Sequence, residues 1–378
     1  MANEPPPSGQ RPALTRRSNT FSMRHRTPPA PELMLTMRTI DWVDGEIELI
    51  DQTLLPAELV FQRIADPDEL IAAIRRLAVR GAPALGVAGA LGVALLARLN
   101  SATDVVRAGA ATLSAARPTA VNLSWGVERA LSRLDQGPAA VLEEALAIRD
   151  ADVAACRAMG EFGADLAQSL VCDKPIRALT ICNTGGLCAV ERGTALGVIQ
   201  TLYERGHLDQ VLAAETRPLL QGARLTSWEL ERMGARYRIV VDSAAPFLLA
   251  RGLADIVIIG ADRIVANGDT ANKIGSFSLA LAARHASVPF VVAAPESTID
   301  LRTADGSGIE IEDRGSEEII AFRGMRIAPE GAQAINPAFD VTPHDLITAI
   351  VTDTRVIHTS AGETPSSVAA GSVRYVPA

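Results

Sequence analysis

The chain changes its pattern of hydrophobic and polar positions near residue 176. From there on, short apolar runs rich in β-branched residues end in a polar residue, and each is followed by a segment with apolar residues at helical spacing. The apolar runs are 178–182, 210–214, 238–241, 256–259, 290–293 and 355–359, and the helical segments include 194–203 and 225–233. Alternation of this kind predicts right-handed crossovers onto a parallel sheet, as in a Rossmann-like fold.

The part of the chain before this change is mostly helical in pattern. Two short strands are predicted first, at 39–43 and 46–50, because β-branched and apolar residues flank the turn dipeptide Asp44-Gly45. Helical spacing of apolar residues then continues to about residue 170.

The longest apolar stretch, 82–97, has about 16 residues and falls short of the ~20 needed to cross a bilayer. Gly86, Gly89 and Gly92 interrupt it. Small residues at three- and four-residue spacing allow a helix to pack closely against a neighbouring backbone. The sequence therefore predicts a helix inside a water-soluble fold here, and no interaction with a membrane.

The expected fold class is α/β: a mostly helical N-terminal domain with a small antiparallel sheet, followed by a Rossmann-like parallel-sheet C-terminal domain. The expected boundaries are 1–31 for a disordered tail, 32–170 for the N-terminal domain and 171–378 for the C-terminal catalytic domain. Residues 1–31 are rich in proline and arginine, and a continuous apolar segment of the kind a secretory signal needs is missing from them.

Removal of residues 1–30 is expected to leave folding and turnover nearly unchanged, because this segment offers little apolar surface to a core. Thermal unfolding and activity of the truncated protein, measured beside the full chain, test this expectation. A truncated protein that aggregates or loses most of its turnover would show that the tail is integrated into the fold.

The net charge and the cysteine count exclude some classes of protein. Lys and Arg number 36 and Asp and Glu 44, so the net charge of -8 gives no general attraction for nucleic acid. Any phosphate must therefore bind at a local site. Four cysteines in 378 residues are too few for a disulfide scaffold. Reduced thiols and a cytoplasmic location are the expectation.

Polar residues gather directly after the predicted strands, where ligands bind in open parallel sheets. The segments are 182–186 (CNTGG), 215–217 (ETR), 242–243 (DS) and 260–263 (GADR), followed by 267–269 (NGD) and 272–273 (NK). Each also has a plain structural interpretation. A cysteine is usually a small buried hydrophobe, and this is the interpretation of Cys156, Cys172 and Cys188. Asp242 could cap a turn or a helix, the glycine pair could serve a turn, and residues 272–273 could be an exposed helix start.

Two further clusters lie in the N-terminal half, at 80–83 (RGAP) and 117–123 (RPTAVNL). An arginine and a glycine that open a helix form a sound anion site, since free N–H groups and the helix dipole face the ligand. His, Cys, Asp and Glu show no metal-ligand spacing anywhere in the sequence. Neither a metal nor an organic cofactor is therefore expected.

These segments together resemble the methylthioribose-1-phosphate isomerase family. The resemblance covers about residues 38–359 and rests on six ordered motifs. They are RGAPALGV at 80–87, NLSW at 122–125, TICNTGGLCAVERGTALGV at 180–198, ETRPLLQGARLTSWEL at 215–230, GADRIVANGDTANKIG at 260–275 and NPAFDVT at 336–342. The wider family also contains ribose-1,5-bisphosphate isomerases and regulatory subunits of the exchange factor for eukaryotic initiation factor 2.

The resemblance implies a catalytic pair, Cys182 and Asp262. The substrate contacts that it implies are Arg80, Gly81, Ala82, Arg117, Gln221, Asn272 and Lys273. Departures from the family motifs stand at Ser124, Gly186, Cys188 and Glu191-Arg192. The implied partners are a sugar phosphate and a second copy of the chain in a homodimer.

Asp262 is expected to be the general acid, because an apolar site without a nearby cation would raise the pKa of its carboxyl. Cys182 would be the base if a helix N-terminus or Lys273 favours its thiolate, and otherwise a polarising thiol. The implied reaction converts 5-methylthioribose 1-phosphate to 5-methylthioribulose 1-phosphate in methionine salvage. Open alternatives are isomerisation of ribose 1,5-bisphosphate or 5-deoxyribose 1-phosphate, and a non-catalytic regulatory subunit.

Overall fold

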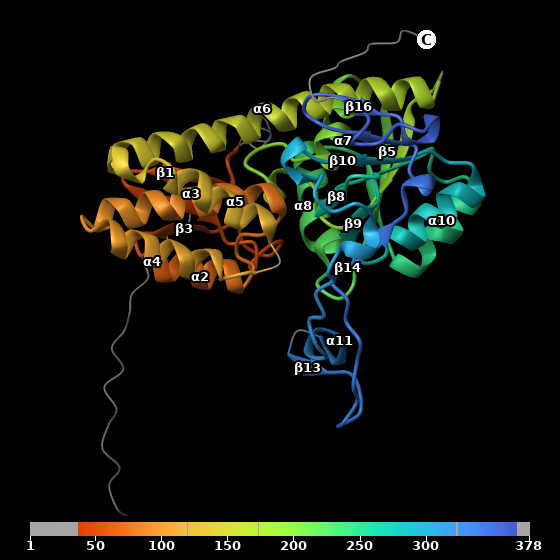
Figure 1. Ribbon diagram of the computed structural model, residues 1–378. Coiled ribbons are helices and arrows are strands. Elements are labelled where there is room, and N and C mark those ends of the chain that lie inside the picture. Colours follow the sequence, from red (N-terminus) through yellow and green to blue (C-terminus); the bar gives the residue numbers. More distant parts are fainter. Residues whose placement is uncertain (1–36, 119, 173, 323, 369–378) are drawn as a thin grey trace, which may run out of the picture.

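The computed structural model describes residues 37–368 except 119, 173 and 323 (Figure 1). The predicted tail, 1–31, lies outside these residues. The described chain has a helical N-terminal region with a small sheet and a C-terminal region built on a larger sheet. This is the predicted α/β fold class, which is confirmed.

The N-terminal region begins with a three-stranded antiparallel sheet and continues with five helices. Its elements are β1 (Ile40–Val43), β2 (Glu46–Ile50), β3 (Phe61–Ile64), α2 (Pro67–Arg75), α3 (Ala82–Leu99), α4 (Thr103–Ser114), α5 (Val121–Leu131) and α6 (Pro138–Leu170). The turn between β1 and β2 is at Asp44 and Gly45, with φ values of 54° and 86°, as a two-residue hairpin requires. The third strand, β3, was not predicted, because the four residues FQRI carry no alternating pattern.

Helix α3 is the centre of the N-terminal core, as its apolar pattern predicts. It is long and apolar enough to span a membrane, but 78% of it is buried inside the protein. Its glycines allow α5 to pack closely against it. A Cβ on Gly89 would lie 2.7 Å from the carbonyl oxygen of Leu123, and Gly126 of α5 packs against the backbone of Gly86. The predicted close packing of this helix is therefore confirmed.

The C-terminal region is built on a seven-stranded sheet in the order β16-β15-β10-β7-β4-β5-β6. The strands are β4 (Ile176–Thr180), β5 (Leu208–Ala214), β6 (Tyr237–Val240), β7 (Ile256–Ile259), β10 (Phe290–Ala293), β15 (Ala349–Val351) and β16 (Val356–Ile357). Alternate residues of β7 enter two separate cores, one on each face of the sheet. Helices α7 (Ala195–Glu204) and α8 (Ser227–Met233) cover one face, and α9 (Ala245–Ala250) and α10 (Ser276–Ala286) cover the other.

The sheet departs from the prediction at one edge. Strand β15 was missed because only three buried residues form it. In the structure, the predicted run 355–359 is reduced to the short strand β16. This strand pairs antiparallel with β15 as a hairpin, so the prediction of a parallel strand at 355–359 was wrong. The remaining neighbours in the sheet pair parallel, as predicted.

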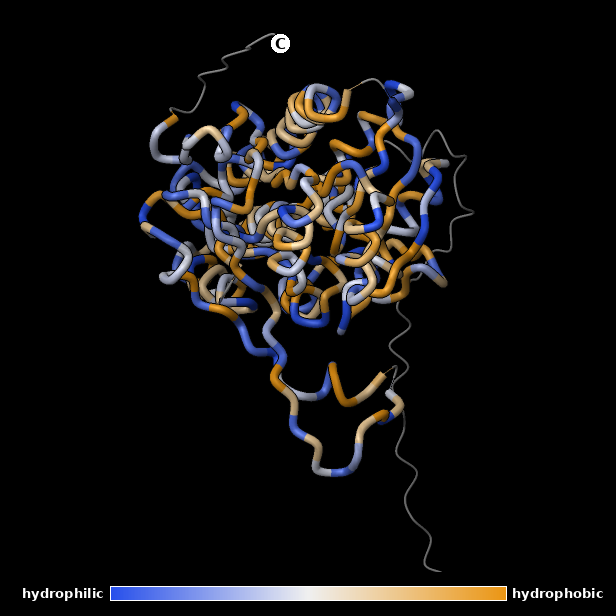
Figure 2. The backbone as a smooth tube through the Cα atoms, turned by 90° about the vertical axis from the view of Figure 1, so that its right-hand side faces the viewer, coloured by the Kyte–Doolittle hydropathy of each residue, from blue (hydrophilic) through white to orange (hydrophobic). Residues whose placement is uncertain are grey.

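A second, four-stranded sheet was not predicted. It has the order β11-β8-β9-β14, and its strands are β11 (Ile299–Asp300), β8 (Arg263–Val265), β9 (Thr270–Lys273) and β14 (Phe339–Thr342). Asn272 and Lys273 thus end a buried strand, and the alternative of an exposed helix start is wrong. Residues 309–338, with α11 (Glu317–Ile320), β12 (Ala321–Phe322) and β13 (Met325–Arg326), project from the body as an arm (Figures 1 and 2).

Helix α6 runs along both regions (Figure 1). Ile148 in its first half belongs to the N-terminal core, whereas Ala164 in its second half packs on the large sheet. The helix ends at Leu170, next to the domain boundary placed at 170 and 171 from the sequence. Its packing ties the two regions together, and the division into domains stays a prediction.

Candidate active site

Cys182 and Asp262 follow neighbouring strands of the large sheet. Strand β4 pairs parallel with β7, with Leu179 opposite Val257, so both loops leave the same edge. The loops touch, because a Cβ on Gly260 would lie 2.8 Å from Cγ2 of Thr184. The structure therefore brings the two predicted catalytic residues to one rim.

The backbone of Cys182 is held from both sides. Its N–H donates to Oγ1 of Thr216 at 2.8 Å, and its carbonyl accepts from Oγ1 of Thr226 at 2.6 Å. Its φ is 65°, in the left-handed region that non-glycine residues rarely adopt, and its side chain is buried. Such a conformation persists only where the surrounding structure fixes it.

Burial raises the pKa of the Asp262 carboxyl, although the charges of Lys273, Arg117 and Arg80 act to lower it. The expectation of a site without a nearby cation was wrong, because three cations surround this carboxyl. The loss of hydration outweighs their attraction, so the direction of the shift is still the one a general acid needs. Glu312, at the base of the arm, adds to the rise.

Arg80 and the start of α3 face the loop that follows Cys182. The buried Arg80 side chain donates to the backbone carbonyl and the side-chain oxygen of Asn183, and also to Oε1 of Gln52. Gly81 has a φ of 94°, and a Cβ there would lie 2.5 Å from Cβ of Cys188. Only glycine fits this close approach. Ala82 then begins α3, so the anion site expected at the first N–H groups of this helix stays a prediction.

Three further predicted contacts come from the C-terminal region. The buried Lys273 donates from Nζ to the carbonyl of Ala338 at 2.9 Å. The neighbouring Asn272 donates from Nδ2 to Oγ of Ser276. Gln221 is 6% exposed, and its Oε1 has no hydrogen-bond partner among the described residues. A buried polar atom without a partner is uncommon and fits a position that a ligand would satisfy.

Arg117 approaches the site from the N-terminal region. Its Nη2 lies 3.7 Å from Oε2 of Glu312, so this pair joins the N-terminal region to the base of the arm. Burial lowers the pKa of the Arg117 guanidinium. No sequence signal singled out Glu312, which lies in an acidic segment typical of a solvated loop.

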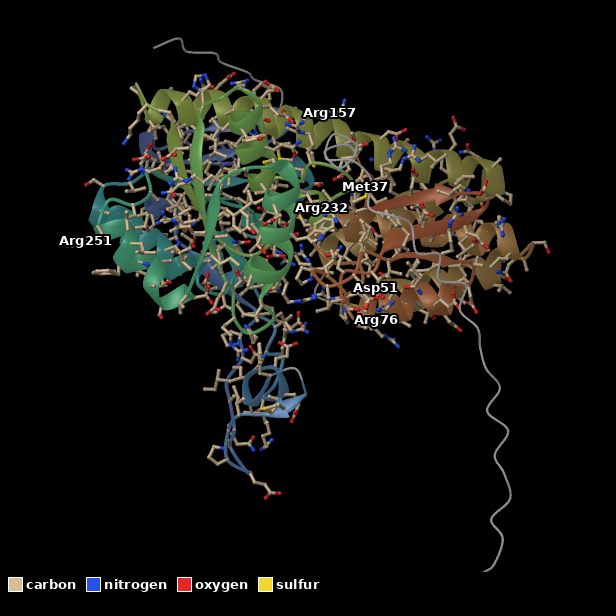
Figure 3. The ribbon with its side chains drawn as sticks, turned by 180° about the vertical axis from the view of Figure 1, so that it is seen from behind. Met37, Asp51, Arg76, Arg157, Arg232 and Arg251 are labelled. Carbon is tan, nitrogen blue, oxygen red and sulfur yellow. The ribbon has the colours of Figure 1, made fainter. Side chains whose placement is uncertain are left out.

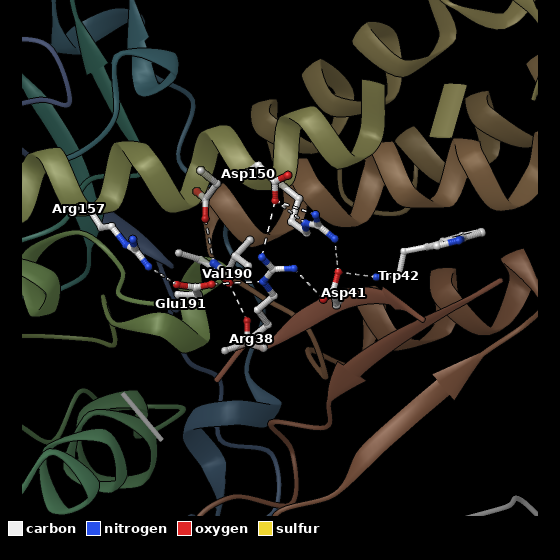
Figure 4. Close-up of polar contacts among 11 residues, drawn as sticks. Arg38, Asp41, Trp42, Asp150, Arg157, Val190 and Glu191 are labelled. Atoms are coloured by element: carbon white, nitrogen blue, oxygen red, sulfur yellow. Dashed lines mark hydrogen bonds and ion pairs between the residues drawn. The ribbon is translucent and has the colours of Figure 1, made fainter. Parts of the chain in front are cut away.

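The far end of the loop after Cys182 is anchored to α6 and β1 (Figure 4). The N–H of Val190 donates to Asp152 at 2.9 Å, and burial raises the pKa of this carboxyl to about 7. Glu191 pairs with Arg38 and Arg157. The motif departure at Glu191 therefore belongs to the anchoring of the loop.

Several other motif residues have structural roles. The Asp242 side chain accepts from the N–H groups of Thr216 and Arg217 in the loop after β5 and, among the described residues, makes no cap hydrogen bond to the helix that follows it, so its interpretation as a helix cap was wrong. Cys156 and Cys188 are buried, as predicted. Cys172 is exposed, so its interpretation as a buried hydrophobe was wrong. Cys172 lies just beyond the end of α6 at Leu170, outside the helical pattern that would have indicated which face it takes.

Within residues 37–368 and outside the three gaps, no group of three or more His, Cys, Asp and Glu side chains could hold a metal ion.

The fold and the site can now be compared with known proteins. Residues 78–359 match the Initiation factor 2 subunit family. The chain belongs to this family. A protein of Anaeromyxobacter sp. (strain Fw109-5) named methylthioribose-1-phosphate isomerase is 50% identical over 325 residues, which are 85% of this chain and 94% of that protein.

Two further relatives have related names. A Nocardia farcinica protein, named a probable bifunctional methylthioribose-1-phosphate isomerase/methylthioribulose-1-phosphate dehydratase, is 48% identical over 89% of this chain. The chain spans only 63% of its length. A Moorella thermoacetica protein named 5-deoxyribose 1-phosphate isomerase is 48% identical over 89% of this chain and 98% of its own length.

Solved structures of the family share the fold. The 5-methylthioribose 1-phosphate isomerase from Pyrococcus horikoshii OT3 has a TM-score of 0.79 and 39% identity, over 87% of this chain and 95% of that one. The translation initiation factor eIF-2B subunit delta from A. fulgidus has a TM-score of 0.77 and 41% identity, over 85% and 96%. The family therefore joins proteins titled as isomerases and proteins titled as translation factors on one fold.

Proposed function

We propose that this protein is an aldose–ketose isomerase that converts 5-methylthioribose 1-phosphate to 5-methylthioribulose 1-phosphate in methionine salvage. Relatives with that name are about half identical to it over nearly their full length. The observation that carries the proposal is the rim on which a partly buried carboxyl of raised pKa, a buried thiol and three cations meet. A module that only binds a partner has no need of this acid and thiol together.

The chemistry of the substrate defines what the site must do. An aldose 1-phosphate is locked as a ring because its anomeric oxygen is esterified, so an acid must protonate the ring oxygen for the ring to open. Asp262 is suited to this step, since burial raises the pKa of its carboxyl, the direction that favours the protonated form. Hydrogen must then move from C2 to C1, through an enediolate-like species or as a hydride, and Cys182 is the base or polarising thiol for this step.

The phosphate is proposed to bind between the start of α3 and Lys273. Free N–H groups at the N-terminus of this 18-residue helix and the Arg80 guanidinium supply positive potential on one side. Lys273 supplies it on the other side, and Arg117 extends it. Gln221 and Asn272 offer hydrogen bonds to sugar hydroxyls.

An assay of the purified protein on 5-methylthioribose 1-phosphate, 5-deoxyribose 1-phosphate and ribose 1,5-bisphosphate distinguishes the candidate activities. Turnover of 5-methylthioribose 1-phosphate at the highest kcat/KM is the expected result. The name of the Moorella relative makes 5-deoxyribose 1-phosphate the second candidate substrate. This sugar phosphate differs from 5-methylthioribose 1-phosphate only in the substituent at C5. Ribose 1,5-bisphosphate would need a second cationic site at C5. Absence of turnover on all three would contradict the proposed function and favour a binding subunit.

Loss of either phosphate-binding cation is expected to weaken substrate binding. Lys273→Ala and Arg80→Ala should each raise KM by the equivalent of about 1–3 kcal/mol, because each removes a charged hydrogen bond. Steady-state kinetics test this. The matched control is Lys174→Ala, which removes the chain's other lysine, an exposed residue paired with Asp255. An unchanged KM in both site variants would place the phosphate elsewhere.

A cytoplasmic homodimer completes the proposal. Large apolar side chains are exposed on the edge strand β6 and on the helices α9 and α10, which pack on each other; among them are Ile239, Phe247 and Leu281. Exposed apolar surface is typical of protein interfaces where it is contiguous. Light scattering after size exclusion should give twice the chain mass, and Phe247→Arg should shift it toward the monomer.

A further inference from the structure

A carboxyl without an assigned role lies against the loop that carries Cys182. Glu229 is on α8 and lines a recess at the junction of the two regions, beside Met37, Leu187 and Arg232. Figure 3 shows Met37 and Arg232 at this junction. Gly185 packs directly on the carboxylate, and a side chain there would collide with it. This explains one member of the glycine pair, which the sequence could assign only to a turn.

The Glu229 carboxylate accepts hydrogen bonds from two points of the loop. Its Oε2 accepts from Nδ2 of Asn183, and its Oε1 accepts from the backbone N–H of Leu187 at 3.1 Å. A carboxylate can only accept hydrogen bonds, so it fixes which end of the Asn183 amide faces it. The NH₂ group must point to Glu229, and Oδ1 must point the opposite way.

The opposite side is occupied by Arg80. The guanidinium of Arg80 donates to both Oδ1 and the backbone carbonyl of Asn183. The three side chains therefore form one chain of hydrogen bonds, from Glu229 through Asn183 to Arg80. In sequence, Arg80 is 103 residues away from Asn183, and Glu229 is 46 residues away from it. Burial raises the pKa of Glu229 to about 7, while Asn183, the Leu187 N–H and the Arg80 charge all favour its ionised form.

We propose that Glu229 is a positioning residue that sets the Arg80 guanidinium for the substrate phosphate by way of Asn183. The proposal rests on the proposed function, in which Arg80 binds that phosphate. Glutamine cannot replace this glutamate, because its amide offers one acceptor and one donor. Its NH₂ group would face either the NH₂ of Asn183 or the N–H of Leu187, so one of the two hydrogen bonds between this side chain and the loop would be lost.

Glu229→Gln is the first test. It should raise KM for 5-methylthioribose 1-phosphate by about 10-fold, the loss expected for a misaligned charged hydrogen bond, and change kcat by less than about 3-fold. Glu231→Gln is the matched control, because Glu231 is exposed on the same helix and bonds only to the hydroxyl of Tyr237 among the described residues. It should leave both constants unchanged.

The route through Asn183 is tested by a double-mutant cycle. Asn183→Ala should raise KM as much as Glu229→Gln does, and the double variant should be no worse than either single one. Additive effects, or a Glu229→Gln protein with lower stability but wild-type KM, would overturn the proposal. If Glu229→Gln does not fold, Asn183→Ala alone decides, and a wild-type KM in that variant rejects the role.

The affinity of the wild type and of the same variants for inorganic phosphate, measured by calorimetry, separates this proposal from the proposed function. Calorimetry needs no turnover, so a wild-type protein inactive on 5-methylthioribose 1-phosphate would refute only the function. Weaker phosphate binding in Glu229→Gln, not additive with Asn183→Ala, would still support the positioning role. Equal phosphate affinity in the wild type and both variants would refute it.

Discussion

Replacing Asp262 with asparagine is expected to lower kcat by at least ~100-fold, the usual scale for the loss of a positioned general acid. Asparagine keeps the shape of the side chain but has no proton to deliver to the ring oxygen. The variant should fold normally, because the backbone N–H of Asp262, which donates to the carbonyl of Ala271, is unchanged by the substitution. Single-turnover and steady-state rates on 5-methylthioribose 1-phosphate measure the effect.

The pH dependence gives a second readout of the same residue. Burial raises the pKa of Asp262, so its protonated, active form persists above the pH at which an ordinary aspartate ionises. The kcat of the wild type should therefore fall as the pH rises through this raised pKa, and Asp262→Asn should lose that limb. Asp345→Asn, an exposed aspartate paired with Arg284, is the control. A near-wild-type kcat in Asp262→Asn would reject the acid role.

Replacing Cys182 with serine is the second change with a large expected effect, again at least ~100-fold in kcat. Serine keeps the size and a hydrogen-bonding group but not the acidic thiol. The backbone bonds to Thr216 and Thr226 do not involve the side chain, so the loop should keep its conformation. Circular dichroism and thermal unfolding should match the wild type.

Two other cysteines control the interpretation of this result. Cys172→Ser should leave turnover unchanged, and because Cys172 is exposed it should also cost little stability. Cys188 lies six residues after Cys182, but burial raises the pKa of its thiol, so it should alkylate slowly. Peptide mapping after iodoacetamide should therefore find label at positions other than Cys188 first. Full kcat in Cys182→Ser would refute the thiol role.

The periodicity of the chain was sufficient to predict most of the fold. Buried strands such as 256–259 and 290–293 are continuous apolar runs because both faces of a parallel sheet are covered. The hairpin at β1 and β2 followed from one turn dipeptide. Strands of two or three residues, such as β11 and β15, could not be found, because so few positions carry no period.

The site was predictable to the extent that it follows strand ends. Cys182 and Asp262 each come directly after a buried strand, so their place on one rim follows from the parallel topology. The residues that adjust the site were not predictable. Glu229 acts on Asn183 across 46 residues, and Glu312 acts on Arg117 across 195 residues. Glu229 lies within the family motif at 215–230, but no role was predicted for it, and Glu312 lies outside the motifs.

The sequence by itself determined the two halves, the order of the sheet-forming runs and the residue types at the strand ends, because each depends on neighbours within one turn or one strand. The tertiary structure alone decided that Lys273 ends a buried strand, that three cations surround Asp262, and that burial still raises the pKa of this carboxyl. Hydration loss and Coulomb attraction depend on distances through space. Those distances are set only when segments remote in sequence pack together.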